Sequence, residues 1–224
     1  MTKVKFKFDE NIDLKNIWET CNSSVLWHDF QQYLPENMVA AAHGKEFTEA
    51  KKEMRKILKS YYNSGNMDIF SNALNDSWKL VEDKYVKRLE QVTKKPLTFD
   101  QIAGYITTTY RCPYYPDEKN PSFMVSTKIS LQGNQVIAGH EIMHIHFHKH
   151  HWDGIEEKLG CDKTGDLKEA LTVLLNLEFK DILFGHDRGY DCHQELRKYL
   201  AQEWEKNKDF DVLLEKGTEY LEVV

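Results

Sequence analysis

Features that would place the sequence in a membrane or in an oxidising compartment are missing. No apolar run is long enough to cross a bilayer, and no apolar signal core follows the N-terminal residues MTKVKFKFDENIDLK. The 4 cysteines are scattered along the chain and form no CxxC pair. Scattered cysteines in a chain with no export signal are expected to be reduced thiols. These absences predict a cytoplasmic protein that does not act in a membrane.

An excess of positive charge is missing as well. The chain has 30 Lys and Arg residues against 36 Asp and Glu residues, and the two signs are interleaved. A surface that binds nucleic acid or an anionic membrane needs a concentration of basic residues. We therefore expect neither as a partner, and the sequence leaves the oligomeric state open.

Residues 1–97 are predicted to form a helical N-terminal region. Apolar residues recur every three or four positions in residues 46–62, and again in residues 70–92 after the break NSGN. Such amphipathic stripes indicate helices that pack against a core. A Lys-Lys-Pro sequence ends the second stripe, and TFDQ at residues 98–101 has the pattern of a short capped helix.

Residues 98–224 have a different texture and are predicted to form the second region, in one compact unit with the first. YITTTYRCPYY at 105–115 is β-branched and aromatic, and SFMVSTKISL at 122–131 alternates like a strand. A histidine-rich helix follows, with Asn134 as its N-cap. Next come an apolar helix over 167–184, a loop bracketed by glycines, and a terminal helix. This order predicts an α+β fold, mostly helical, with a small antiparallel sheet packed next to the histidine helix.

The segment AGHEIMHIHFHKHHW, residues 138–152, contains six of the chain's 10 histidines. Within it, HEIMH places His140 and His144 four residues apart, on one face of a helix. Two imidazoles with this spacing can bind one zinc ion and leave positions for a third ligand and a water. Glu141 lies beside that face and could take a proton from the water. The pattern therefore predicts a zinc cofactor, a nucleophile and a general base.

The other histidines of the segment are expected to lie outside this site. His148 and His151 continue roughly the same face, but one and two turns further along the helix. His146 and His150 are predicted to point to solvent. The four are interpreted as polar surface, with a weak secondary metal site as the alternative.

A strand followed by a helix with the His-Glu-x-x-His motif resembles the zincin metallopeptidases, and the resemblance covers about residues 104–200. It implies hydrolysis of a peptide bond by a zinc-activated water, with a peptide or protein as substrate. Zincins bind extended peptide along a strand edge that borders the cleft. The resemblance therefore implies that SFMVST, and within it Phe123, Met124 and Val125, binds substrate.

The clan within the zincins depends on the third ligand. His150 stands where metzincins have their third histidine, but Phe147 replaces the glycine at which their helix breaks, and no methionine follows Met143 for a Met-turn. Peptide deformylases have a cysteine ligand in a Glu-Gly-Cys sequence, whereas Cys112 lies in YRCPYY. Gluzincins, which take a glutamate from a following helix, match the sequence best.

Glu169 is the predicted third ligand. It shares one narrow polar stripe with Thr172 and Asn176 on an otherwise apolar helix, and a buried carboxylate needs a partner such as a metal ion. Thr172 and Asn176 are predicted to orient the ligands. The alternatives are that Glu169 only complements the positive N-terminus of its helix, or that Glu178 is the ligand. Thermolysin-like gluzincins have an acidic residue four positions after the ligand, where this sequence has Val173.

Tyr190 and His193, in the loop framed by Gly185 and Gly189, are the candidate donors to the oxyanion that develops during acyl transfer. The predicted function is therefore that of a zinc metallopeptidase. Two alternatives stay open. One is a catalytically inactive zincin-like binding or regulatory protein, which a fourth protein ligand would mark. The other is a histidine-rich helix that binds several metal ions weakly.

Overall fold

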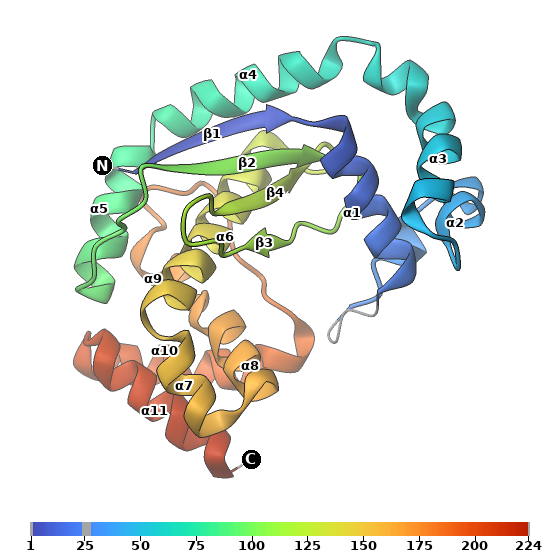
Figure 1. The fold of residues 1–224 in the computed structure, drawn as a ribbon. Helices are drawn as coiled ribbons and strands as arrows, with labels where there is room; N and C mark the ends of the chain where they lie inside the picture. Colours follow the sequence, from blue (N-terminus) through green and yellow to red (C-terminus); the bar gives the residue numbers. More distant parts are fainter. Residues whose placement is uncertain (1, 24–27, 224) are drawn as a thin grey trace.

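The computed structural model describes residues 2–23 and 28–223, in which helices surround one four-stranded sheet (Figure 1). The strands are β1 (Lys3–Phe8), β2 (Gln101–Thr107), β3 (Tyr114–Tyr115) and β4 (Ser122–Ser126). The α-helices of the first part are α1 (Glu10–Asn22), α2 (Glu36–Ala42), α3 (Phe47–Tyr62), α4 (Asn66–Lys79) and α5 (Glu82–Thr93). Those of the second part are α6 (Leu131–His150), α7 (Trp152–Leu159), α8 (Cys161–Leu171), α9 (Val173–Glu178), α10 (Gln194–Asn207) and α11 (Phe210–Val223). The predicted α+β class is confirmed.

The sheet has the order β1-β2-β4-β3 and is mixed. β1 pairs in parallel with β2, and β2 pairs in parallel with β4, while the short β3 runs antiparallel to β4. The prediction of an antiparallel sheet is therefore wrong for the two longer pairings. The prediction of a helical N-terminal region missed the strand β1. Its sequence KVKFKF alternates lysines with apolar residues, of which Val4 and Phe6 are buried. Since β1 joins β2, the two predicted regions share one sheet.

The short helix predicted at residues 98–101 is absent from the described structure, because residues 98–100 have no regular secondary structure and lead directly into a strand. Gln101 begins β2 and pairs with Lys3. Just before it, the Thr2 hydroxyl lies 2.7 Å from the carbonyl oxygen of Leu97 and 2.6 Å from that of Phe99. These contacts hold the segment along the N-terminal strand, so strand pairing overrides the local capping pattern.

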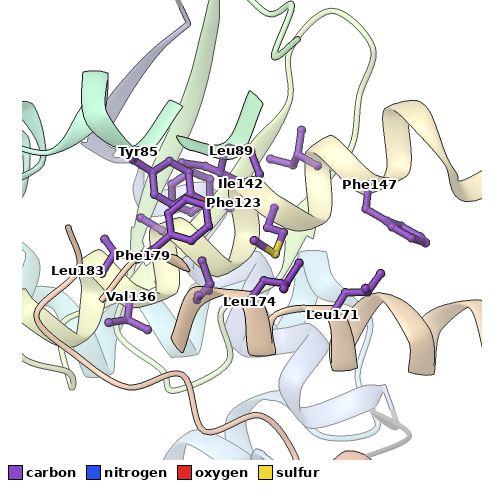
Figure 2. Packing of buried hydrophobic residues seen from close by; sticks show 14 of the residues in the cluster. Tyr85, Leu89, Phe123, Val136, Ile142, Phe147, Leu171, Leu174, Phe179 and Leu183 are labelled. Atoms are coloured by element: carbon purple, nitrogen blue, oxygen red, sulfur yellow. The ribbon is translucent and has the colours of Figure 1, made fainter. Parts of the chain in front are cut away.

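The predicted amphipathic stripes form the main core. Trp78 of α4 and Tyr85 of α5 are buried among apolar residues of the sheet and of α6, and the Tyr85 ring lies tilted against that of Phe179, with the centres 5.0 Å apart (Figure 2). Gly104 in β2 makes this packing possible, because a side chain there would approach the Phe6 ring to 2.6 Å. A smaller core forms between α1, α2 and α3. Among the described helices, none is long and apolar enough to span a membrane.

A buried asparagine joins the end of β4 to the start of α6. The Asn134 side chain accepts a hydrogen bond from the Ser126 backbone N–H at 2.8 Å and donates to the Ser126 carbonyl at 2.9 Å. Asn134 is therefore not the N-cap that we predicted. The cap is Ser130, whose hydroxyl accepts from the Gly133 N–H. The helix begins one turn earlier, and Asn134 fixes where it leaves the sheet.

The apolar helix predicted over 167–184 is broken. α8 ends at Leu171, and α9 is a separate short helix from Val173 to Glu178. The hydroxyl of Thr172, between them, lies 2.7 Å from the carbonyl oxygen of Glu169. This break puts Glu169 in the last turn of α8 and leaves Thr172 at the bend.

Candidate metal centre

Three side chains from two helices converge beside the sheet. α6 carries His140 and His144, whose ring centres lie 4.2 Å apart, and α8 carries Glu169. Nε2 of His140 lies 3.3 Å from one carboxylate oxygen of Glu169, and Nε2 of His144 lies 3.2 Å from the other. Within the described ranges, these residues form the one group whose potential ligand atoms all lie within 4.8 Å of one another. The sequence reasoning thus selected side chains that the fold brings together.

The chemistry of this group fits a divalent metal ion. Nε2 of His144 and Oε2 of Glu169 are buried, and despite these short distances neither makes a hydrogen bond of good geometry with a residue that the structure describes. Buried polar atoms are rarely left without partners, because their desolvation is costly. Two imidazole nitrogens and one carboxylate oxygen that face one another are a donor set typical of zinc.

The pKa values show which of these groups are charged. Burial favours the neutral form of Glu169, but His144 and Lys168 outweigh it and hold the pKa of the carboxyl well below its ordinary value. Burial, helped by the positive charge of Lys168, lowers the pKa of His144 to about 3. Glu169 is therefore ionised and His144 neutral near pH 7, which are the forms that bind a metal ion, whereas the raised pKa of His140 means that this imidazole would release a proton when a metal ion binds.

Glu141 lines the pocket next to these ligand candidates. Its pKa is raised to about 8, mainly by burial, and the nearby negative charge of Glu169 adds to the shift. A carboxyl whose pKa lies near neutrality can both accept and release a proton under physiological conditions. Its environment is thus that of a proton-transfer group rather than of a surface glutamate.

Asp187 is the residue of this cluster that the sequence reasoning missed. Its Oδ1 lies 2.9 Å from Nδ1 of His140, so it fixes the ring that presents Nε2 to Glu169. Burial favours the neutral form of His140, but the carboxylates of Asp187 and Glu169 outweigh it and raise the pKa of His140 well above its ordinary value. A carboxylate bound to the outer nitrogen of a ligand histidine is the usual support in metal sites. One signal of this is present in the sequence: Val173 stands where thermolysin-like gluzincins have an acidic residue, so the carboxylate that supports a ligand histidine has to come from another position.

Thr172 and Asn176 act on the site through Asp187. The Thr172 hydroxyl lies 2.8 Å from Asp187 Oδ2, and Asn176 makes two hydrogen bonds of 2.8 Å with the Asp187 backbone. Arg197 of α10 donates to Asp187 Oδ2 at 2.9 Å and to Thr172 Oγ1 at 2.6 Å. Gly189, with φ of +62°, lets the loop pass Arg197, because a side chain there would approach the guanidinium to 2.9 Å. The predicted orienting residues therefore hold the residue that orients His140.

A pocket of about 190 Å³ opens onto the three ligand candidates and Glu141. Its other described lining residues are Phe30, Arg111, Cys112, Pro113, Tyr114, Lys168 and Tyr190. Burial raises the pKa of the Tyr190 hydroxyl and that of the Cys112 thiol, so both are protonated near pH 7. Tyr190 thus lies where a hydrogen-bond donor was predicted, and Cys112 lies in the same pocket without joining the group of ligand atoms.

His193 is not among the described residues that line this pocket. Its Nε2 lies 2.9 Å from Asp166 Oδ1, and its ring packs against Tyr190 with the centres 5.9 Å apart. The short helical turn that begins after Tyr190 directs the histidine towards α8. Of the two candidate oxyanion donors, only Tyr190 therefore lines the pocket, and His193 packs against the Tyr190 ring from outside the pocket lining.

The substrate-binding prediction for Phe123, Met124 and Val125 is wrong. All three side chains are buried, and β4 is an inner strand of the sheet. The edge that we expected to be free is occupied, because β3 pairs with β4 and the Met124 N–H donates to the Pro113 carbonyl. An alternating apolar segment predicts a strand but not its place in the sheet.

The remaining histidines and the reserve ligand have other partners. The prediction that His146 faces solvent is wrong, because His146 is buried and its Nε2 lies 3.1 Å from the Lys95 carbonyl oxygen. The His148 ring stacks on Trp152, and His150 Nε2 lies 2.9 Å from the Pro96 carbonyl oxygen. Glu178, the alternative third ligand, accepts hydrogen bonds from Trp204 and Lys208 and does not belong to the group of ligand candidates.

Comparisons with protein-family models, with curated proteins and with solved structures found no match for this chain.

His146 should make the stability of the protein sensitive to acid. Burial lowers its pKa to about 3 from an ordinary 6.5. Between these values the unfolded chain binds a proton that the folded chain does not, so the free energy of unfolding falls as the pH decreases. In urea denaturation at about pH 7 and about pH 5, wild type should lose up to about 1.4 kcal/mol per pH unit more than His146→Gln. Equal slopes in the two proteins would show that His146 is not held neutral.

Proposed function

We propose that the protein is a zinc-dependent hydrolase that cleaves peptide bonds, similar to the gluzincin metallopeptidases. In this proposal His140, His144 and Glu169 bind zinc, and Glu141 is the general base. The observation that carries it is the convergence of the three ligand candidates within 4.8 Å, in the wall of a pocket that also contains Glu141. The two helices come from segments that the sequence motif alone does not connect.

The number of ligand candidates supports a catalytic site rather than a structural one. Structural zinc sites have four protein ligands, whereas catalytic sites have three and leave one position open. In the part of the chain that the structure describes, no fourth His, Cys, Asp or Glu belongs to the group. The contacts of His146 and His150 with backbone carbonyls also argue against a helix that binds several ions.

The residues of the pocket have the properties that hydrolysis requires. A zinc ion held by His140, His144 and Glu169 would supply a Lewis acid that polarises the carbonyl group and makes water a stronger nucleophile. Glu141 receives the proton of the attacking water and delivers it to the leaving nitrogen. Tyr190, whose hydroxyl is protonated, donates a hydrogen bond to the developing oxyanion. Asp187 keeps the His140 ring in place throughout.

A peptide or protein substrate is consistent with the surroundings of the pocket. A second hollow of about 360 Å³ shares Phe30 and Arg111 with it, so the two hollows adjoin at these residues. A cytoplasmic location is part of the proposal, because the four cysteines are free thiols, as expected in a reducing compartment.

Zinc content tests the ligand assignment. Dialysed wild type should hold close to one zinc per chain by elemental analysis, and Glu169→Ala should hold it much more weakly because one of the three ligands is lost. Glu178→Ala is the matched control, since Glu178 lies in the following helix and contacts Trp204 instead. Wild type without zinc, or zinc equally tight in Glu169→Ala, would contradict the assignment.

Replacing the general base tests catalysis separately from metal binding. Glu141→Gln keeps the size of the side chain but cannot accept the proton, so peptide hydrolysis should fall by about 100-fold or more with zinc content unchanged. A peptide mixture analysed by mass spectrometry before and after incubation provides the assay. If neither wild type nor variant cleaves any peptide while both hold zinc, the protein is an inactive zincin-like binding or regulatory module.

Asp187→Asn should weaken zinc binding by about 10- to 100-fold, because the His140 ring loses its negatively charged partner. Asp166→Asn is the control, since Asp166 lies on α8 like Glu169 but its carboxylate contacts His193. Competition with a chelator of known affinity measures both variants. Equal affinities in Asp187→Asn and Asp166→Asn would contradict the supporting role of Asp187.

A further inference from the structure

Lys168 is a buried lysine in the wall of the proposed active site, and the proposed mechanism gives it no role. Only 6% of the residue is exposed, and its Nζ lies 2.9 Å from Glu169 Oε1. Nζ also lies 4.5 Å from the centre of the Tyr114 ring, within the range of a cation–π contact. Lysines are almost never fully buried unless their charge is met by another group.

The direction of the Lys168 side chain is unusual for its position. Adjacent residues on a helix point to different sides, so a lysine next to a buried ligand would normally extend into solvent. Lys168 instead lines the same pocket as Glu169, with its ammonium between that carboxylate and Tyr114. The ammonium is therefore held at the place where substrate would meet the ligands.

The charges around the pocket leave room for an anion once zinc is bound. The carboxylates of Glu141, Glu169 and Asp187 face the cations Lys168 and Arg197. With a divalent ion bound by neutral imidazoles, these three carboxylates would face two side-chain cations and the ion, which leaves an excess of one positive charge. Arg111, the other cation of the pocket wall, is already met by Glu19 at 3.1 Å.

Lys168 and a bound metal ion would share the negative charge of Glu169, and this sharing makes Lys168 the group that would bind the anion. Glu169 Oε1 lies 2.9 Å from Lys168 Nζ and 3.2 Å from His144 Nε2. The same oxygen therefore forms the ion pair with the lysine and lies next to one of the other ligand candidates. A carboxylate that shares its charge with a metal ion neutralises a neighbouring ammonium less completely. An ammonium has three N–H donors, so a substrate carboxylate can bind it in exchange for one of its present contacts.

We propose that Lys168 binds a carboxylate of the substrate, so that the site prefers peptides with a carboxylate next to the scissile bond. The inference rests on the proposed function, because the position of the scissile bond is defined by the ligand group. The carboxylate belongs either to the C-terminus of a short peptide or to an acidic side chain. Lys168 is in this account a specificity-determining residue, while Glu141 remains the catalytic base.

Binding of short peptides to the zinc-loaded Glu141→Gln protein tests the proposal without turnover. The probes are N-acetyl-glycyl-glycine, its C-terminal amide, and N-acetyl-aspartyl-glycine amide, titrated by calorimetry. The free acid should bind about 10-fold or more tightly than the amide, because a charge-assisted hydrogen bond is lost in the amide. The aspartyl amide distinguishes the two sources, since it regains the affinity only if a side-chain carboxylate is accepted.

Three further substitutions, made in the same protein, identify the group that provides the preference. Lys168→Met should abolish the difference between acid and amide, and Lys168→Arg should retain most of it because the charge is kept. Arg111→Met removes the cation that is already paired with Glu19, so the preference should survive. Thermal unfolding of each variant checks that it is folded, and Lys168→Arg decides the question if Lys168→Met is not.

The proposal is overturned if zinc-loaded protein binds acid and amide equally, if it binds neither, or if Lys168→Met keeps the full preference. The last result would mean that the metal ion or Arg111 holds the carboxylate. An equal loss of affinity for acid and amide in Lys168→Met would also overturn it, because the lysine would then act on the peptide carbonyl. Zinc content measured beside each titration separates the two failures, since protein without zinc refutes the proposed function itself.

Discussion

The buried carboxylate of Glu169, facing two imidazoles of α6, is the interaction on which the arrangement of the C-terminal helices depends. An ionised carboxylate cannot be buried without compensation, because its desolvation costs several kcal/mol. His140, His144 and Lys168 approach it at 2.9 to 3.3 Å. For this to happen α8 must end beside α6, and the break at Thr172 turns the chain away at that point. The geometry of the site therefore determines the path of the chain after it.

A second set of contacts connects the site to the rest of the molecule. Asp187 contacts the His140 ring and is itself hydrogen-bonded to Thr172, Asn176 and Arg197. The position of this imidazole ring therefore depends both on the loop that contains Asp187 and on the helix α10. Each of these groups is satisfied by the next, as buried polar networks require. On the opposite side, α6 is fixed to the sheet through the hydrogen bonds of Asn134 and packs against Tyr85 (Figure 2). The helix α6 is thus held at its start and along its apolar side.

The sequence could predict the parts of this arrangement that depend on local spacing. Two histidines four residues apart define a face of α6 wherever the helix lies, and Glu169 is conspicuous because it interrupts an apolar helix. Asp187 could not be found in this way, because its role depends on a loop returning to α6. The burial of His146 likewise depends on the Lys95 carbonyl of a distant segment. The parallel pairing of β1 with β2 joins strands separated in the chain by the helices α1 to α5, and no local pattern encodes that register.

The central claim is that one zinc ion is bound by two imidazole nitrogens and the carboxylate of Glu169, with a position left open. X-ray absorption at the zinc edge of the zinc-loaded protein tests it most directly. The account predicts only nitrogen and oxygen neighbours at about 2.0–2.2 Å, with the signature of two imidazoles that is reduced to one in His144→Ala. A sulfur neighbour at about 2.3 Å would assign Cys112 as a ligand and contradict the account. A spectrum unchanged by His144→Ala would place the metal ion elsewhere on the chain.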